Sequence, residues 1–568
     1  MLKQPVLPDE SSHPFWERYQ LTPNNAVLLL QCAILFILVV MPLGVIIYKS
    51  FFDRDGLYVG LANYVAYFSD STLTSSIFNS LFIAVIATSI TLVTASLYAF
   101  ALTSSRIPLK GFFKVVALLP ILAPSLLPAI SLVYLFGNQG ILKALLGDLE
   151  IYGPLGIVMG YCFWLFPAAL MIMISAFRGL DARLFEASRS LGASPLKTFY
   201  FVMLPSLRIG LVSTVLIAFT NVMTDFGIPK VIGGSYNMMA LDVYKQIIGQ
   251  QNFSMGAVVS LLLVIPAVIS FTIDRLQKKS QSRMQHQDIR PYLSGKNKGL
   301  TIALFVFCAL IAGFMLLVTG TAIFASFVQY WPYDMTLGLS HYNFEYVDGG
   351  WNSYFNSLKL AFAVSIFGTL FIFLAAFTSQ RLRGYEFLKN TIQGFALLPM
   401  AIPGLVLGLA YIFFFNDRAN PLSFLYGTMY ILILSTIIHY YTVPHLTAVA
   451  AIKQLPIQLD NAARSLGVSL PKTLWKVYIP VCLPAIFDIS VYLFVTAMTT
   501  VSAAIFLYTP DTILASVSIL NMDDAGDTAA AAAMGSLVLI SSMIIKLVHW
   551  LCTRALLQRT QAWRQFNQ

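Results

Sequence analysis

Long apolar runs separated by short polar segments dominate the chain and predict membrane-spanning helices. A helix needs about 20 mostly apolar residues to cross a hydrocarbon core of about 30 Å. Six runs of this length precede the polar stretch 275–298, and six follow it. They lie at 25–48, 77–103, 112–136, 152–177, 207–228 and 254–274, and then at 299–327, 354–379, 387–415, 424–451, 482–507 and 530–553. The pattern predicts an all-α polytopic membrane protein with twelve transmembrane helices.

The two sets of six spans repeat one another. Residues 186–205 and 461–480 are identical at 10 of 20 positions without a gap, and each segment follows the fourth span of its half. A shorter repeat begins at Asn79 (NSLFIAV) and at Asn356 (NSLKLAF). Because six spans return the chain to its starting side, the halves form two parallel six-helix repeats, related by an axis along the membrane normal.

Composition and charge support a membrane protein and indicate its orientation. Of the 568 residues, 58% are hydrophobic and only 11% are charged, and the mean hydropathy is +0.76. If the N-terminus is cytoplasmic, the inner segments hold 27 of the 35 lysine and arginine residues and the outer segments hold six. This asymmetry predicts that both termini and both repeated segments are cytoplasmic. It also accounts for the net charge of +10, so we expect no nucleic-acid partner.

The span boundaries predict five parts of the chain. The first transmembrane domain comprises residues 25–274 and the second comprises 299–553. Polar cytoplasmic segments are expected at 1–24 and 554–568. Residues 275–298 are basic and polar and are typical of a flexible cytoplasmic linker between the halves. The five cysteines have no paired spacing, so we expect neither a disulfide framework nor a metal site.

Each repeated segment predicts two short helices joined at a glycine. Gly192 and Gly467 can adopt the left-handed conformation that ends a helix. Ser194 and Ser469 follow at positions suited to cap a second helix. We call residues 180–205 hairpin 1 and residues 455–480 hairpin 2.

The hairpins resemble the cytoplasmic coupling loops of binding-protein-dependent ABC importer permeases of type I. The shared pattern is Glu-Ala-Ala, three residues, Gly, nine residues, Ile, any residue and Leu-Pro. Hairpin 1 matches with Glu186, Ala187, Ser188 and Gly192, and hairpin 2 with Asn461, Ala462, Ala463 and Gly467. The resemblance covers essentially the whole chain and implies the type I importer transmembrane fold, with both halves fused in one chain.

The resemblance also implies partners. Two copies of a cytoplasmic ABC ATPase, which bind ATP and Mg, are expected to dock on the hairpins, and a periplasmic binding protein is expected to deliver the solute. The implied location is the lipid bilayer of a bacterial inner membrane. The chain has no GxxxxGK[ST], HExxH or GxSxG motif, so we expect no catalytic residue and no cofactor on it.

The two hairpins differ at the first position of the motif. By resemblance, Glu186 contacts the ATPase and pairs with a basic residue there. Asn461 takes this position in hairpin 2 and brings no charge. The neighbouring Asp460 is an open alternative, since a small rotation of the helix would let its carboxylate replace the missing glutamate.

Polar residues near the ends of spans five and eleven are candidates for the transport pathway. They are Asn221, Thr224 and Asp225 in the first half and Thr496, Thr499 and Thr500 in the second. Polar faces at equivalent depths of two repeats are typical of a shared pathway. We expect Asp225 to mark the end of its helix rather than to bind substrate.

Prolines and histidines within the spans allow more than one interpretation. Prolines 120, 124 and 128 in span three and prolines 399 and 403 in span nine remove helix hydrogen bonds, either for packing or to line a path. His439 and His445 in span ten are expected to form hydrogen bonds between helices rather than to bind a metal.

The substrate is the least constrained feature. The fused layout resembles ferric-iron permeases, whereas residues 225–260 look most like permeases assigned to 2-aminoethylphosphonate uptake. We therefore favour an importer of 2-aminoethylphosphonate or a related phosphonate, with a ferric-iron importer as the alternative. A secondary transporter driven by an ion gradient is the alternative from another class.

Overall fold

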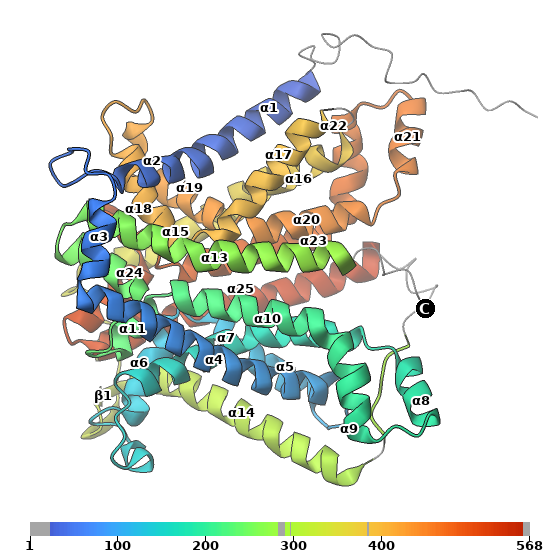
Figure 1. The fold of residues 1–568 in the computed structure, drawn as a ribbon, viewed down its shortest axis with the longest axis horizontal. Helices are drawn as coiled ribbons and strands as arrows, with labels where there is room; N and C mark the ends of the chain where they lie inside the picture. The colour runs from blue at the N-terminus through green and yellow to red at the C-terminus, as the bar shows by residue number, and fades with distance from the viewer. Residues whose placement is uncertain (1–22, 282–289, 296, 383–384, 561–568) are drawn as a thin grey trace, which may run out of the picture.

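The computed structural model of the protein describes residues 23–281, 290–295, 297–382 and 385–560. Most of these residues are helical (Figure 1). The helices of the first half are α1 (Pro23–Leu35), α2 (Met41–Lys49), α3 (Ala62–Ser69), α4 (Ser71–Thr103), α5 (Lys110–Leu118), α6 (Leu126–Phe136), α7 (Pro154–Arg178), α8 (Ala182–Ser190), α9 (Pro195–Thr198), α10 (Leu204–Thr224), α11 (Gly227–Ile232), α12 (Met239–Tyr244) and α13 (Phe253–Gln281).

The second half adds one short antiparallel pair of strands to the same plan. Its elements are α14 (Lys298–Ala325), β1 (Val328–Tyr330), β2 (Asp334–Leu337), α15 (Gly350–Ala363), α16 (Thr369–Arg381), α17 (Glu386–Leu397), α18 (Gly404–Phe415), α19 (Met429–His439), α20 (Thr442–Lys453), α21 (Gln458–Ser465), α22 (Leu470–Thr473), α23 (Ile479–Thr499), α24 (Ala515–Asp524) and α25 (Thr528–Thr560).

The described residues contain up to twelve candidate spans. Nine helical segments are long and apolar enough to cross a membrane, and three pairs of shorter segments pass the same test together. The bent pairs are Lys110–Leu122 with Leu126–Phe136, Glu386–Ala401 with Gly404–Phe415, and Met429–His439 with Thr442–Lys453. Figure 1 shows α5 and α17 nearer the end that carries α8 and α21, and α6 and α18 nearer the opposite end, whereas α19 and α20 lie in the reverse order. The predicted all-α polytopic fold is confirmed, with six spans in each half when each pair counts as one.

Spans three and nine are bent by 106° and 113° at their prolines. Pro120 lies in a 3-10 turn and Pro124 in the break that follows, and Pro399 and Pro403 repeat this arrangement in span nine. Pro128 lies in the first turn of α6, where a helix needs no N–H donor. The lack of backbone N–H groups at these prolines therefore breaks spans three and nine at equivalent places.

Span ten is also broken, although the sequence predicted a continuous helix over 424–451. Helix α19 ends at His439, α20 begins at Thr442, and their axes are bent by 57°. Pro444 supplies the physical reason, because a continuous helix would need its absent N–H to bond the carbonyl of Tyr440. A proline is tolerated in the first turn of the new helix.

Spans five and eleven end earlier than predicted. Helix α10 ends at Thr224 instead of 228, and α23 ends at Thr499 instead of 507. Each is followed by short helices before the next long one begins, α11 and α12 in the first half and α24 in the second. Thr500 therefore caps the end of a helix and does not lie within one.

The repeated Asn-Ser pairs hold these short helices in place. Ser80 Oγ accepts a hydrogen bond from the N–H of Met239 (2.9 Å), and Ser357 Oγ accepts one from the N–H of Ala515 (2.8 Å). The side chain of Asn79 donates to the carbonyl of Asn237, and that of Asn356 donates to the carbonyl of Asp511 (3.0 and 2.9 Å). The NSL repeat thus anchors the first residue of α12 in one half and of α24 in the other.

The first span of each half packs on the other half. Helices α1 and α2 contact α17 and α18, whereas α14 contacts α4, α5 and α6 (Figure 1). Two hydrogen bonds join α1 and its continuation to the second half, from Thr378 Oγ1 to Gln31 Oε1 (2.7 Å) and from Tyr411 OH to the carbonyl of Leu38 (2.8 Å). The two sequence halves are therefore not separate packing units.

Candidate functional site

Both hairpins have the predicted shape, and they lie apart from each other at one end of the molecule (Figure 1). In hairpin 1, α8 leads through Gly192 (φ +72°) into α9, and Ser194 Oγ accepts a hydrogen bond from the N–H of Lys197 (3.3 Å). In hairpin 2, α21 leads through Gly467 (φ +66°) into α22. Ser469 precedes α22 as expected, but its side chain makes no capping hydrogen bond.

The hairpins present a mostly exposed surface. Glu186, Ala187, Asn461 and Ala462 are exposed, as are Gly192 and Gly467, whereas Ser188 is buried and Ala463 is half-buried. Ser188 Oγ bonds to Thr198 Oγ1 (2.8 Å) and so ties α8 to α9. Leu191 and Leu466 beside the two glycines are 86% and 79% exposed.

Hairpin 1 contacts the segment that joins the two halves. The N–H of Ala182 donates to the carbonyl of Arg290 (2.8 Å), and Arg290 Nη1 lies 3.5 Å from Glu186 Oε1. Helix α13 also continues through the first residues of the segment, as far as Gln281. Parts of the predicted linker 275–298 therefore have defined contacts, and residues 282–289 and 296 lie outside the described ones.

A half-buried carboxylate begins α8. Asp181 caps the helix by accepting from the N–H of Arg183 (3.1 Å), and the Arg183 side chain donates to the same carboxylate. These hydrogen bonds to the charged form lower the pKa of Asp181 below its ordinary value. The Asp181 carboxylate therefore pairs in its ionised form with the Arg183 guanidinium at the start of hairpin 1.

Asp460 is buried, whereas the neighbouring Asn461 is exposed on the surface of hairpin 2. Its carboxylate accepts a hydrogen bond from Tyr478 OH (2.7 Å) and lies 3.3 Å from Arg381 Nη1. Arg381 also donates to the carbonyls of Ile452 and Leu455 (2.5 and 2.7 Å). The side chains of Arg381 and Asp460 are only 6% and 5% exposed. This network fixes hairpin 2 from inside and turns Asp460 away from the surface.

Most hydroxyls among the pathway candidates bond to their own helix. Thr224 donates to the carbonyl of Thr220 (2.9 Å), Thr496 to that of Tyr492 (2.8 Å) and Thr499 to that of Val495 (3.0 Å). Asn221 lies one turn before the end of α10, where its carbonyl accepts from the N–H of Asp225 (3.0 Å). Each of these threonines therefore uses its hydroxyl proton within its own helix and could only accept hydrogen bonds from a substrate.

Asp225 lies at the end of α10, as the sequence predicted. Its carboxylate accepts from the N–H of Ile228 (3.2 Å), and its carbonyl accepts from Tyr161 OH (3.1 Å). Tyr440, at the break of span ten, lies next to Thr500 and close enough to Asp225 for the carboxylate to act on it. Asp225 of the first half therefore lies within electrostatic range of Tyr440 of the second half. The sequence signal for this contact was Pro444, which breaks the helix beside Tyr440.

Three of the four ring nitrogens of the histidines in span ten lack the expected hydrogen bonds among the described residues. Among the described residues, neither ring nitrogen of His445 and not Nδ1 of His439 has a hydrogen-bond partner. The ring of Tyr441 stacks on His445 with the centroids 5.5 Å apart. The described residues contain no group of three His, Cys, Asp or Glu side chains that could hold a metal ion.

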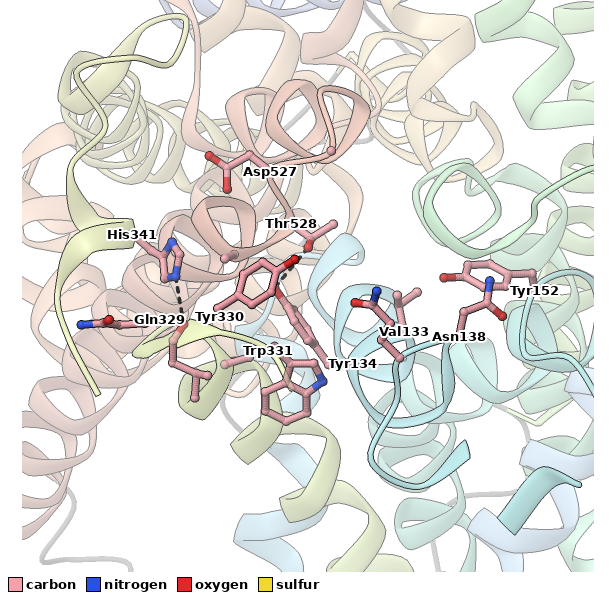
Figure 2. Close-up of a pocket in the computed structure, with 15 residues that line it drawn as sticks. Val133, Tyr134, Asn138, Tyr152, Gln329, Tyr330, Trp331, His341, Asp527 and Thr528 are labelled. Atoms are coloured by element: carbon pink, nitrogen blue, oxygen red, sulfur yellow. Dashed lines mark hydrogen bonds between the residues drawn. The ribbon is translucent and has the colours of Figure 1, made fainter. Parts of the chain in front are cut away.

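A cavity of about 430 Å³ with both polar and apolar lining lies between the halves, away from the hairpins (Figure 2). Tyr134 OH and Thr528 Oγ1 form a hydrogen bond across it (3.1 Å). Nearby, Lys230 Nζ pairs with Asp524 Oδ1 at 2.9 Å. Side chains that line the cavity include Tyr134, Asn138 and Tyr152 of the first half and Gln329, Trp331, His341, Asp527 and Thr528 of the second. The halves are therefore joined at the end opposite the separated hairpins.

A family profile described as binding-protein-dependent transport system inner membrane component matches the chain twice, over residues 91–286 and 368–556. The chain belongs to this family of ABC importer permeases. Each match covers the last spans of one half and includes one hairpin, so the permease carries both family domains in one chain.

Curated relatives of the permease include proteins named for ferric transport. The ferric transport system permease protein FbpB of Actinobacillus pleuropneumoniae is 29% identical over 86% of this chain and 72% of its own length. The Fe(3+)-transport system permease protein FbpB 2 of Haemophilus influenzae is 24% identical over 77% of this chain and 81% of its own. The spermidine/putrescine transport system permease protein PotB of Haemophilus influenzae is 27% identical over 45% of this chain and 96% of its own.

Proposed function

We propose that this permease is the membrane subunit of an ATP-driven importer for ferric iron. The observation that carries the substrate is the relative named for ferric transport that matches 86% of the chain across both halves. This replaces our preference for a phosphonate, which rested on residues 225–260 alone. The chemistry of ATP hydrolysis belongs to a partner, since the chain has no phosphate-binding loop.

Two copies of an ABC ATPase dock on the two hairpins in this proposal. The exposed Leu191 and Leu466 and the exposed Glu186 are suited to this contact. A periplasmic binding protein delivers the ion at the opposite end, and the hairpins, the termini and the linker are cytoplasmic. The charge asymmetry of 27 to six supports this orientation in a bacterial inner membrane.

The proposed transport cycle follows from the two ends of the molecule. The contacts Lys230–Asp524 and Tyr134–Thr528 join the halves at one end, while the hairpins lie apart at the other (Figure 1). Closure of the ATPases on ATP would draw the hairpins together and separate the joined end, and hydrolysis would reset it. The region around Asp225, Tyr440 and Thr500 lies between the halves and is proposed to line the path.

The test compares two nutrients in a strain that lacks the permease gene. We expect uptake of radioactive Fe(III) citrate to fall and growth on 2-aminoethylphosphonate as sole phosphorus source to continue. The reverse pattern would identify a phosphonate importer. Uptake that survives deletion of the ATPase subunit and stops with a protonophore would identify a secondary transporter instead.

A further inference from the structure

Residues 290–294 run alongside the start of hairpin 1 in a strand-like pairing. Asp181 and Pro291 form an antiparallel bridge, flanked by hydrogen bonds from the N–H of Ala182 to the carbonyl of Arg290 (2.8 Å) and from the N–H of Tyr292 to the carbonyl of Leu180 (3.3 Å). Bonds on both sides of the bridge fix the register of the two segments.

The same residues also reach the end of span two. The N–H of Ser294 donates to the carbonyl of Ser104, the residue that caps α4, at 2.7 Å. The ring of Tyr292 stacks on Phe185 with the centroids 3.8 Å apart and the planes 23° apart. Phe185 is buried, so Tyr292 covers the inner side of α8. Residues 290–294 therefore tie hairpin 1 to α4.

Hairpin 2 is tied to the equivalent helix by different means. Asp460 is the counterpart of Phe185 in the repeat, and it bonds to Arg381, the last residue of α16. Helix α16 ends span eight, as α4 ends span two. Both hairpins are thus fixed to the end of the second span of their half, one by an aromatic stack on the linker and the other by a buried ion pair.

We infer that residues 290–294 act as a strap that positions hairpin 1 for coupling to the ATPase, with Tyr292 as the positioning residue. The inference rests on the proposed role of the hairpins in coupling. The strap ends four residues before α14 begins, and α14 packs on α4, α5 and α6. Movement of hairpin 1 therefore displaces the first helix of the second half directly, without passing through the bundle.

The pair of Glu186 and Arg290 extends the strap to the surface. Their side chains are 58% and 69% exposed, so water screens the interaction strongly. A basic residue of the ATPase can therefore replace Arg290 as the partner of Glu186 on docking, with little loss of stabilisation for the strap. Phe185 is buried, and the stack of Tyr292 on it holds the strap in place while the partner of Glu186 changes.

The first arm of the test measures the strap itself. The native cysteines are replaced by alanine, and cysteines are introduced by Asp181→Cys and Pro291→Cys, whose bridge geometry suits a disulfide. A protease site is placed at residues 284–287, between the two cysteines. After cleavage, a disulfide keeps the two fragments joined on a non-reducing gel. The matched control is Pro456→Cys with Pro291→Cys, because Pro456 is the repeat counterpart of Asp181.

We expect the first pair to cross-link in native membranes and the control pair not to. Adding Tyr292→Ala is expected to slow cross-linking by about two- to tenfold, the range expected for loss of an aromatic pair. Adding Tyr292→Phe, which keeps the ring, is expected to leave the rate unchanged. Equal cross-linking of the two pairs, or an equal effect of both Tyr292 substitutions, would overturn the strap.

The second arm measures coupling in cells that carry the native ATPase and binding protein. We expect Tyr292→Ala to lower the maximal rate of Fe(III) citrate uptake at an unchanged KM, and Tyr292→Phe to restore it. A normal maximal rate with Tyr292→Ala, in a variant that reaches wild-type abundance in membranes, refutes the positioning role. Failure of the unmodified permease to support ATP-dependent uptake refutes the proposed function instead, and the cross-linking arm then still decides whether the strap exists.

Discussion

Replacing Asp460 with alanine would leave the Arg381 guanidinium buried without its anionic partner. Both side chains are almost fully buried, at 6% and 5% exposed. Removing one member of a buried ion pair costs about 3–5 kcal/mol, because the remaining charge is uncompensated. Arg381 keeps two backbone carbonyls as acceptors, those of Ile452 and Leu455, so we expect a cost near the lower limit, about 3 kcal/mol. This cost should loosen hairpin 2, because the pair joins it to α16.

Thermal unfolding of the purified permease measures this cost. Cys308 and Cys482 are buried, so a thiol-reactive dye reports their exposure on heating. At about 2–4 °C per kcal/mol for a large domain, the melting temperature should fall by about 6–12 °C. Asp460→Asn keeps a hydrogen-bond acceptor for Tyr478, so the melting temperature of this variant should fall less than that of Asp460→Ala. Glu186→Ala breaks an exposed pair and should change the stability by less than about 1 kcal/mol.

The double variant Arg381→Met with Asp460→Leu separates charge from packing. Replacing both members of a buried ion pair with apolar residues is often neutral. We therefore expect the double variant to melt closer to the wild type than Asp460→Ala does. A melting temperature of Asp460→Ala equal to that of Glu186→Ala would refute the buried network. An unchanged melting temperature with a loss of ATPase binding would show instead that Asp460 contacts the ATPase.

Three further predictions concern the hairpins and their orientation. Glu186→Ala should reduce co-purification of the ATPase more than Asn461→Ala does, because only Glu186 carries a charge; equal losses would refute the difference between the hairpins. Gly192→Val and Gly467→Val should each lower Fe(III) citrate uptake severely, whereas asparagine at either position should be tolerated. Both glycines have positive φ with open space around them, so backbone strain is the expected cause. Equal effects of valine and asparagine would exclude backbone strain. Single cysteines in place of Tyr346 and Leu191, which are 90% and 86% exposed, should react with an impermeant reagent from opposite sides of the membrane, and labelling of both from one side would refute the topology.

Several features that depend on local sequence were predicted correctly, although the break of span ten beside Pro444 was missed. The twelve apolar runs are long enough to identify the spans without knowledge of their packing, and prolines 120, 124, 399 and 403 marked two of the bends. Gly192 and Gly467 marked the corners of the hairpins, because a positive φ favours glycine whatever surrounds it. Hairpin shape follows from a few neighbouring residues, so one sequence sufficed to predict it.

Features that depend on distant contacts were missed. Arg381 and Asp460 are 79 residues apart in the chain, and neither position alone indicates an ion pair. The strap was taken for a flexible linker because its composition is polar, yet a strand-like pairing needs only backbone groups and one aromatic ring. The amino-acid composition does not indicate which backbone groups lie opposite each other. The polar composition of the linker therefore predicted that it is exposed to solvent, but not which residues it contacts.

In both halves the hairpin is fixed to the end of the second span, but the side chains that fix it differ between the two halves. A carboxylate at position 185 would be buried without partners, because Ser104 occupies the repeat position of Arg381 and Met203 that of Tyr478. A phenylalanine at position 460 would likewise leave Arg381 uncompensated. Each anchor is therefore consistent only with its own set of neighbours. The first half is anchored through the strap, which pairs with the start of hairpin 1, whereas hairpin 2 is anchored by an ion pair within its own half.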